Sequence, residues 1–246
     1  MNLKERLKAL TPDLMKKLIR PVRALTIKKS SATLAFWKSR YIIDHGHFIN
    51  YQYRELMLAM AEETSDVFLT GKIVADFGCG PRGSLVWAQS ALLRVGIDVL
   101  ADRYADLFTD NMISHGMIYL KSTEKIIPLP SDFIDVMFTL NAMDHVDDFP
   151  SMCREILRVI KPGGLFIGSF NLGEPPTPSE PQRLDEEMIK YNLIDKLELL
   201  SYRITKKGPV ENIYSPFFNG NLTYRDGQEG ILWIRAKKPG EVNGEK

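Results

Sequence analysis

The stretch Val74-Ala-Asp-Phe-Gly-Cys-Gly-Pro-Arg-Gly83 decides the fold of this protein. An apolar run of strand length leads into three glycines spaced G-x-G-x-x-G, which is typical of a nucleotide-binding turn. The spacing alone is a weak signal, but its position strengthens it. A predicted helix over residues 84–93 follows the turn, and the next apolar run ends in Asp98, twenty residues after Gly78. A carboxylate at that place can hold both hydroxyls of a ribose.

The acid at the end of the first predicted strand distinguishes between two cofactors that bind to such a turn. In a dinucleotide site the turn and the following helix face a pyrophosphate, which would repel a carboxylate at Asp76. S-adenosylmethionine has no phosphate and carries an ammonium and a sulfonium group, which a carboxylate attracts. The sequence therefore favours S-adenosylmethionine over a nicotinamide dinucleotide.

Apolar runs of strand length alternate with segments of helical composition from residue 72 onward. This alternation predicts an α/β protein with a parallel sheet that helices cover. The last two runs are separated by a polar loop, residues 205–230, and are predicted to form an antiparallel hairpin at the end of the sheet. The six predicted strands are residues 73–77, 94–98, 133–140, 165–170, 198–204 and 231–236.

Residues 1–53 are predicted to form an N-terminal helical and aromatic extension ahead of one domain, residues 54–246. Leucines recur at three- and four-residue steps among Lys and Arg over residues 1–29, which predicts a basic amphipathic helix broken by prolines. Such a helix packs on the body of the protein or binds an anionic membrane or partner, and the sequence leaves both open. A second helix is expected over residues 51–68.

Four motifs, in order along the chain, resemble those of class I S-adenosylmethionine-dependent methyltransferases of the type 11 small-molecule group. They are Val74 to Gly83, Val95-Gly-Ile-Asp98, Ile127-Pro-Leu-Pro-Ser-Asp-Phe-Ile-Asp-Val136 and Leu157-Arg-Val-Ile-Lys-Pro-Gly-Gly-Leu-Phe-Ile167. The resemblance covers residues 70–172. It implies a Rossmann-like, seven-stranded, mostly parallel sheet with an antiparallel C-terminal strand, and a methyltransferase whose cofactor is S-adenosyl-L-methionine and whose product is S-adenosyl-L-homocysteine.

The resemblance also implies which residues contact the cofactor. The methionine part lies along the turn, the ribose on Asp98, and the adenine against the residues that follow it. Where many relatives have an Asp that accepts from the adenine amino group, this chain reads Ser122-Thr123-Glu124. A serine hydroxyl accepts that bond without charge assistance, or a neighbouring acid or a backbone carbonyl takes over. The expected cofactor-binding residues are Asp76, Gly78, Cys79, Gly80, Asp98, Val99, Leu100, Ser122, Thr123, Glu124 and Asn141.

His145 is the candidate catalytic residue. It follows the predicted strand over residues 133–140, whose carboxyl end should lie beneath the reacting centre. Imidazoles titrate near neutral pH, so this one could accept the proton of an attacking hydroxyl, although the matching histidine often serves only structure in the resembling family. The nearby Asp144, Asp147 and Asp148 are interpreted as partners of a helix N-terminus, and no metal is predicted.

The composition excludes several classes of protein. The 246 residues are 44% apolar and 26% charged, the balance of an ordinary globular protein. The net charge of +1 divides into +9 over residues 1–40, which hold 11 basic and 2 acidic residues, and −8 over the rest. Two cysteines make no disulfide framework, and no apolar run approaches 18 residues, so a cytoplasmic protein is expected.

Two aromatic segments outside the cofactor motifs could shape an acceptor pocket, residues 36–53 and residues 214–224. Aromatic faces with hydroxyl, amide and imidazole groups suit a sugar or a phenolic hydroxyl compound. The predicted substrate-binding residues are Tyr41, Tyr51, Tyr53 and Tyr214. Because residues 1–53 join the domain just before its first strand, we expect them to cover the acceptor site and exclude water.

The acceptor class is narrowed by what the sequence lacks. Asn141-Ala-Met-Asp144 is not the Asn/Asp-Pro-Pro-aromatic motif of nucleic-acid amino methylation, and neither Cys79 nor Cys153 is placed for cytosine C5 chemistry. The leading prediction is transfer to a hydroxyl of a sugar or specialised metabolite, with no nucleic acid as partner. Two alternatives stay open: an anionic macromolecule or lipid-linked saccharide reached through the basic N-terminus, and a cofactor-binding protein without catalysis. The oligomeric state is not predicted.

Overall fold

The computed structural model describes residues 29–209, 212–220, 223–225 and 227–240. The predicted basic helix over residues 1–29 therefore falls outside the described residues, apart from Lys29 at its end. No helix within the described ranges is long and apolar enough to span a membrane.

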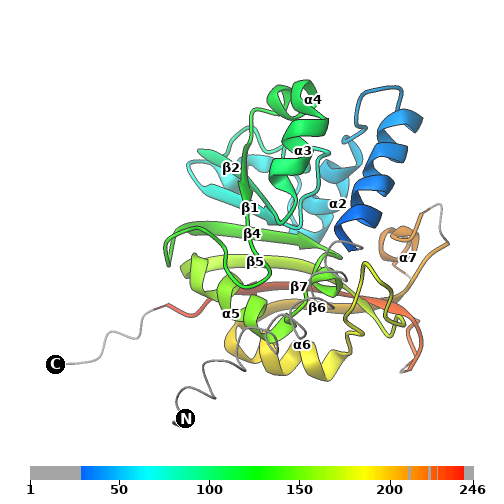
Figure 1. The fold of residues 1–246 in the computed structure, drawn as a ribbon. Helices are drawn as coiled ribbons and strands as arrows, with labels where there is room; N and C mark the ends of the chain where they lie inside the picture. Colours follow the sequence, from blue (N-terminus) through cyan, green and yellow to red (C-terminus); the bar gives the residue numbers. More distant parts are fainter. Residues whose placement is uncertain (1–28, 210–211, 221–222, 226, 241–246) are drawn as a thin grey trace, which may run out of the picture.

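A seven-stranded sheet with the order β3-β2-β1-β4-β5-β7-β6 forms the centre of the protein (Figure 1). The pairs β1–β2, β2–β3, β1–β4 and β4–β5 are parallel, and β7 is antiparallel to both β5 and β6. This confirms the predicted mostly parallel sheet and the C-terminal hairpin. The strands are β1 (Ile73–Phe77), β2 (Leu93–Asp98), β3 (Ile118–Lys121), β4 (Ile134–Leu140), β5 (Ile160–Leu172), β6 (Glu198–Lys206) and β7 (Gly230–Lys237).

Strand β3 was not among the six apolar runs that the sequence pattern singled out. It is four residues long and lies at one edge of the sheet, and Ile118 is exposed. A short edge strand with little burial has neither the length nor the continuous apolar character that marks the central strands.

The helix predicted directly after the glycine turn is wrong. Residues 81–92 form a succession of turns between β1 and β2. The segment is held by long-range contacts instead: the Asp66 carboxylate accepts from the Ser90 amide at 2.9 Å, and the Arg94 guanidinium donates to the Val86 carbonyl at 3.1 Å. Leu85 and Ala88 are fully buried. Tertiary packing therefore outweighs the local helical preference here.

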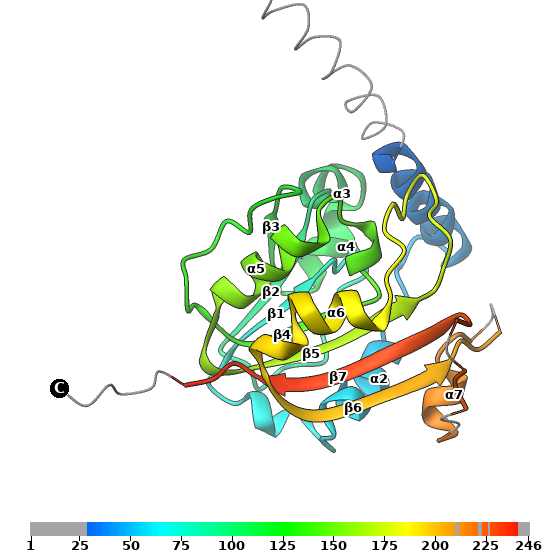
Figure 2. The same ribbon diagram turned by 90° about the horizontal axis from the view of Figure 1, so that it is seen from below.

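Helices cover both faces of the sheet, as Figure 2 shows edge-on. Helices α5 (Phe149–Val159) and α6 (Glu186–Asn192) pack on one face, where Met137 is buried. Helices α2 (Gln52–Ala61) and α7 (Ser215–Phe218) pack on the other face, where the neighbouring Phe138 is buried. Alternate residues of a strand thus serve the two layers. The helix expected over residues 51–68 is α2 followed by a separate 3₁₀ turn, Asp66–Leu69.

A third apolar cluster joins the N-terminal extension to the edge of the sheet. Tyr104 of α3 (Ala101–Leu107), Met112 of α4 (Thr109–Ser114) and Phe108 between the two helices pack against Phe48. A helix over residues 29–43 lies beside this cluster and adds Trp37 and Tyr41. The boundary predicted between residues 53 and 54 falls inside α2, so the extension and the domain share one packed body at this point.

Candidate functional site

A cavity of about 410 Å³ lies at the carboxyl ends of β1, β2, β3 and β4. Ligands of open α/β sheets bind at this edge, and the volume is in the usual range for a small-molecule site. Every residue predicted to bind the cofactor lines this one cavity, and so does the predicted catalytic residue. These residues are Asp76, Gly78, Cys79, Gly80, Asp98, Val99, Leu100, Ser122, Thr123, Glu124, Asn141 and His145.

The glycine turn approaches its neighbours more closely than side chains allow. Gly78 has a φ of +74°, and a Cβ atom there would collide with the side chain of Ala142. A Cβ atom on Gly80 would lie 2.7 Å from the ring of Trp37. The first glycine therefore lets β1 pass beneath the segment after β4, and the second lets the N-terminal helix close against the turn.

Asp98 is held at the end of β2 by two backbone amides. Its carboxylate accepts from Gly80 N at 3.0 Å and from Leu100 N at 2.9 Å. Burial raises the pKa of this carboxyl, and the two amide donors oppose that effect. Each oxygen keeps a further lone pair, which suits it to accept from the hydroxyls of a ribose.

Asp76 is 2% exposed and lies at the fourth position of β1. The Ser84 hydroxyl donates to its Oδ2 atom, whereas Oδ1 is buried without a hydrogen-bond partner. Burial raises the pKa of this carboxyl to about 7; the Ser84 hydrogen bond lowers it and the charge of Asp98 raises it. A buried carboxylate oxygen with no donor is costly, so this site is suited to a ligand that brings a cation or a donor.

Asn141 supplies a second unpartnered acceptor in the same cavity. Its backbone is left-handed, with a φ of +45°, and its amide Nδ2 donates to the Tyr214 hydroxyl at 3.3 Å. Its Oδ1 atom is buried without a partner. Together with Asp76 Oδ1 it offers acceptors and no donor, which fits the ammonium of S-adenosylmethionine and not a phosphate.

The net charge of the cavity lining also favours S-adenosylmethionine over a dinucleotide. Four carboxylates and one ammonium group line it, so the lining has a net negative formal charge when all are ionised. A cationic ligand is attracted by such a lining, and a dinucleotide is repelled. The charged lining residues are Asp76, Asp98, Glu124, Glu180 and Lys29.

At the expected adenine end, Ser122 is buried and its amide donates to the Asp98 carbonyl at 3.1 Å. Glu124 is engaged elsewhere: it accepts from Lys29 Nζ at 3.0 Å and from the Asp147 amide at 3.2 Å. Both of its oxygens therefore have partners. Ser122 and the backbone remain to accept from an adenine amino group.

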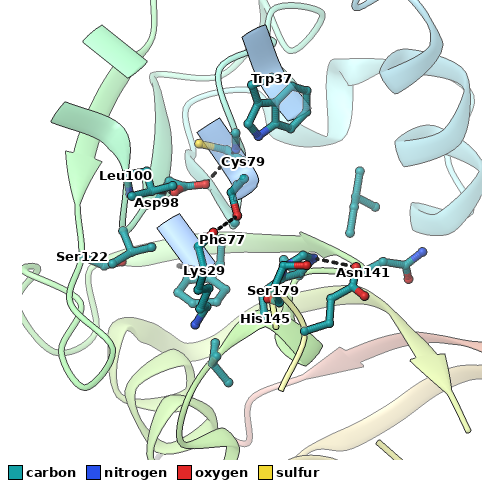
Figure 3. A pocket seen from close by; sticks show the side chains of 18 of the residues that line it. Lys29, Trp37, Phe77, Cys79, Asp98, Leu100, Ser122, Asn141, His145 and Ser179 are labelled. Carbon is teal, nitrogen blue, oxygen red and sulfur yellow. Dashed lines mark hydrogen bonds and ion pairs between the residues drawn. The ribbon is translucent and has the colours of Figure 1, made fainter. Parts of the chain in front are cut away.

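His145 lines the same cavity from the 3₁₀ turn Met143–His145 that follows β4 (Figure 3). Its Nδ1 atom is 3.0 Å from the Ser179 carbonyl, which can only accept, so Nδ1 carries a proton and donates. The Nε2 atom is 3.7 Å from Glu180 Oε1 and 3.9 Å from Asp144 Oδ1. Among the described residues, Nε2 therefore faces two carboxylates and has no hydrogen-bond donor directed at it.

The four tyrosines predicted to bind substrate divide into two pairs. Tyr53 and Tyr214 line the cavity, and both are half-buried there. Tyr41 packs between Phe48 and Phe108, and Tyr51 is 79% exposed at the start of α2. Neither Tyr41 nor Tyr51 lines the cavity, so we leave both out of the proposed site.

Several cavity residues were not anticipated from the sequence. Lys29 comes from the helix over residues 29–43, which passes beside the cavity and also places Trp37, a member of the aromatic segment expected there, in its wall (Figure 3). Ser179 and Glu180 come from the proline-rich connector after β5, which the sequence indicated only as a link between elements. Their nearness to the glycine turn depends on long-range packing, and no local motif marks them.

Comparison with known proteins places the cofactor motifs in a family. Residues 75–168 match the methyltransferase domain family. The chain is 31% identical over 102 residues to the ubiquinone/menaquinone biosynthesis C-methyltransferase of Vibrio parahaemolyticus, a match that covers 40% of this chain and 36% of that protein. It is 25% identical to the malonyl-[acyl-carrier protein] O-methyltransferase of Serratia marcescens, over 58% and 54% of the two chains. The chain thus spans about a third to a half of the length of these relatives.

Solved structures share the fold at low sequence identity. A putative sarcosine dimethylglycine methyltransferase from Galdieria sulphuraria has a TM-score of 0.60 at 12% identity, over 85% of this chain and 98% of that one. The [4+2]-cyclase SpnF has a TM-score of 0.56 at 19% identity, over 78% and 84%.

The sheet order and a cavity at the carboxyl ends of its strands define a Rossmann-like, cofactor-binding α/β protein. Within that class, residues 75–168 match the methyltransferase domain family, and this match supports the predicted class I S-adenosylmethionine-dependent methyltransferase and its cofactor. The predicted family, fold and cofactor are thereby confirmed.

Proposed function

We propose that this protein transfers a methyl group from S-adenosylmethionine to a hydroxyl oxygen of a small molecule, such as a sugar or a specialised metabolite. The observation that carries the proposal is the placement of His145, whose free Nε2 atom lies in the same cavity as the cofactor-binding turn. The similar proteins include a C-methyltransferase and an O-methyltransferase, so the acceptor atom is argued from this site and not taken from them.

S-adenosylmethionine supplies a methyl group bonded to a cationic sulfur. The residues of this chain then have three tasks: to bind, to orient and to exclude water. Asp98 with Gly80 and Leu100 binds the ribose, and Asp76 with Asn141 binds the ammonium. Positioning and desolvation provide much of the acceleration of such a transfer, so a sparse catalytic set suffices.

His145 is the proposed proton acceptor for the attacking hydroxyl. The Ser179 carbonyl holds the ring as the Nδ1–H tautomer, so a proton would arrive at Nε2. The carboxylates of Asp144 and Glu180, within 4 Å of Nε2, would stabilise the imidazolium that forms. This is the arrangement that a general base needs.

The acceptor side of the cavity favours a compound with an apolar face and hydroxyl groups. Phe36 and Leu140 provide apolar surface, and Tyr53 and Tyr214 provide phenol groups. Aromatic rings with polar groups at their edges are typical of sites for sugars and phenolic compounds.

Two measurements test the proposal. Calorimetry should show that S-adenosylhomocysteine binds and that NAD(H) does not. A screen of hydroxyl compounds with methyl-labelled cofactor should then find an acceptor, and His145→Ala should lower its turnover by about 10²- to 10⁴-fold while cofactor affinity is unchanged. Tight NAD(H) binding would refute the cofactor, and a loss below tenfold would refute the role of His145.

A cofactor-binding protein that transfers no methyl group is the second candidate. It is favoured by the likeness to a [4+2]-cyclase, because one fold hosts different reactions. Failure of every acceptor to consume the cofactor, with cofactor binding intact, would support it. The third possibility, an anionic macromolecule or lipid-linked acceptor, depends on residues 1–29; binding to anionic vesicles that weakens with salt would support it.

A further inference from the structure

Three side chains with ligating atoms meet beside the cofactor cavity. Asp144 and His145 follow β4, and Glu180 lies in the connector after β5. One atom of each, Asp144 Oδ1, His145 Nε2 and Glu180 Oε1, lies within 4.8 Å of the other two. Of the three, His145 and Glu180 line the cavity itself.

Each of these side chains is oriented through its other polar atom. Asn171 Nδ2 donates to Asp144 Oδ2 at 2.9 Å, His145 Nδ1 donates to the Ser179 carbonyl at 3.0 Å, and Thr177 Oγ1 donates to Glu180 Oε2 at 3.1 Å. Histidine that ligates a metal almost always donates its second N–H in this manner, and ligating carboxylates are in turn hydrogen-bonded. The remaining atoms are left to face one another.

The connector that carries Glu180 is tied to the turn that carries the other two residues. Gln182 N donates to the Asp144 carbonyl at 3.2 Å, and Gln182 Nε2 donates to the Asp147 carbonyl at 3.0 Å. These hydrogen bonds therefore fix the position of Glu180 relative to Asp144 and His145.

Asp144 is 4% exposed, and its Oδ1 atom is buried without a hydrogen-bond partner. The nearest groups to that atom in the cluster are Nε2 of the His145 ring and the Glu180 carboxylate. Two carboxylates at this separation, one of them buried, repel each other unless a positive charge lies between them. A metal ion held between the three atoms would relieve this repulsion and give Asp144 Oδ1 a partner.

We propose that Asp144, His145 and Glu180 bind one divalent transition-metal ion, such as Mn²⁺ or Zn²⁺. A set of two carboxylate oxygens and one imidazole nitrogen suits these ions. Ligand atoms about 2.1 Å from a tetrahedral ion lie about 3.4 Å apart. The separations of 3.7 and 3.9 Å from Nε2 need only a small contraction, and the two carboxylate oxygens, within 4.8 Å of each other, need a larger one.

The inference rests on the proposed methyl transfer for its catalytic meaning, and with the ion bound it gives His145 the role of a ligand in place of proton acceptor. A cation held at the cavity wall keeps coordination positions open to the acceptor, and it makes a bound hydroxyl more acidic. The acceptor would then carry two neighbouring oxygens, as in a vicinal diol or a hydroxy acid. Because a ligating Nε2 cannot accept a proton, His145 would hold the ion in this state, and the hydroxyl proton would leave to water.

Metal binding to the full chain tests this without any acceptor. Titration with Mn²⁺, followed by electron paramagnetic resonance and calorimetry, should show one site per chain. Asp144→Asn, His145→Ala and Glu180→Gln should each weaken it at least about tenfold. Glu187→Gln, at an exposed acid of α6, is the matched control and should leave affinity unchanged. A His45→Ala/His47→Ala variant should also bind normally, because those exposed imidazoles lie outside the cluster.

Two outcomes would overturn the inference. One is the absence of Mn²⁺ and Zn²⁺ binding up to about 1 mM, the weak end of metal affinities; the other is binding that the three cluster variants do not weaken. S-adenosylhomocysteine calorimetry on the same samples keeps the two proposals apart: intact cofactor binding without metal binding refutes only the metal site and leaves Nε2 as the proton acceptor. Metal binding without cofactor binding refutes the proposed function instead.

Discussion

At the scale of single residues, Asp76 is expected to give the ligand-free protein an unusual pH dependence. The folded carboxyl titrates near pH 7, well above the value of an unfolded Asp. Between about pH 4 and pH 7 the unfolded state therefore binds fewer protons, and the free energy of unfolding falls as pH rises. Urea unfolding at pH 5 and pH 8 should show a loss on the order of a few kcal/mol, and Asp76→Asn should shrink it. Equal losses in the two proteins would contradict a raised pKa at Asp76. Asp98, whose pKa is also raised, accounts for the loss of stability with pH that Asp76→Asn retains.

Asp98 is expected to carry much of the cofactor affinity. Removing a carboxylate that accepts from two ribose hydroxyls should weaken S-adenosylhomocysteine binding by about 1.5–3 kcal/mol, the range for charge-assisted hydrogen bonds. Calorimetry of Asp98→Ala measures this. Asp102→Ala, which removes an exposed acid of α3 paired with Lys121, is the control. Unchanged affinity in Asp98→Ala would mean that the ribose lies elsewhere.

At the scale of secondary-structure elements, Lys29 fastens the N-terminal helix to the loops after β3 and β4. Lys29 is 8% exposed, and its ammonium donates to Glu124 at 3.0 Å and to Asp147 at 2.9 Å. Lys29→Met removes the charge and keeps the stem. Amide hydrogen exchange over residues 30–43 should then speed up by about tenfold, because the helix loses two ion pairs. The expected effect is no larger because Asp147 is partly exposed, and solvent weakens its ion pair. Lys38→Met, at an exposed site of the same helix, should leave exchange unchanged.

At the scale of the whole molecule, residues 29–43 act as a wall of the cavity, and their removal should affect cofactor and acceptor alike. A chain that starts at His47 keeps Phe48, whose amide donates to Asn111, and all of α2. It should fold, because the sheet and its helices are intact, but bind S-adenosylhomocysteine at least about tenfold more weakly and lose turnover. Circular dichroism, calorimetry and the methyl-transfer assay measure the three properties. Full activity would show that the helix does not cover the site.

The strands and the cofactor turn could be predicted from the sequence because their signals are local. β1 was predicted to the residue, since four apolar residues and Asp76 lead into glycines where a Cβ atom would collide with its neighbours. Asp98 was placed by its distance along the chain from Gly78. In both cases the side chains that define the element are neighbours in sequence, so a short window contains the whole pattern.

The sequence by itself determined the α/β class, the cofactor turn and the cofactor, because adjacent residues encode them. Tertiary structure alone decided the walls of the cavity. It replaced the helix predicted over residues 84–93 by buried turns, and brought Lys29 to Glu124 across 95 residues and Glu180 to His145 across 35. It also separated Tyr53 from Tyr51, two positions away, by placing one in the cavity wall and leaving the other exposed. Contacts between residues far apart in sequence depend on how the helices pack on the two faces of the sheet. The periodicity of side chains along the sequence carries no information about that packing.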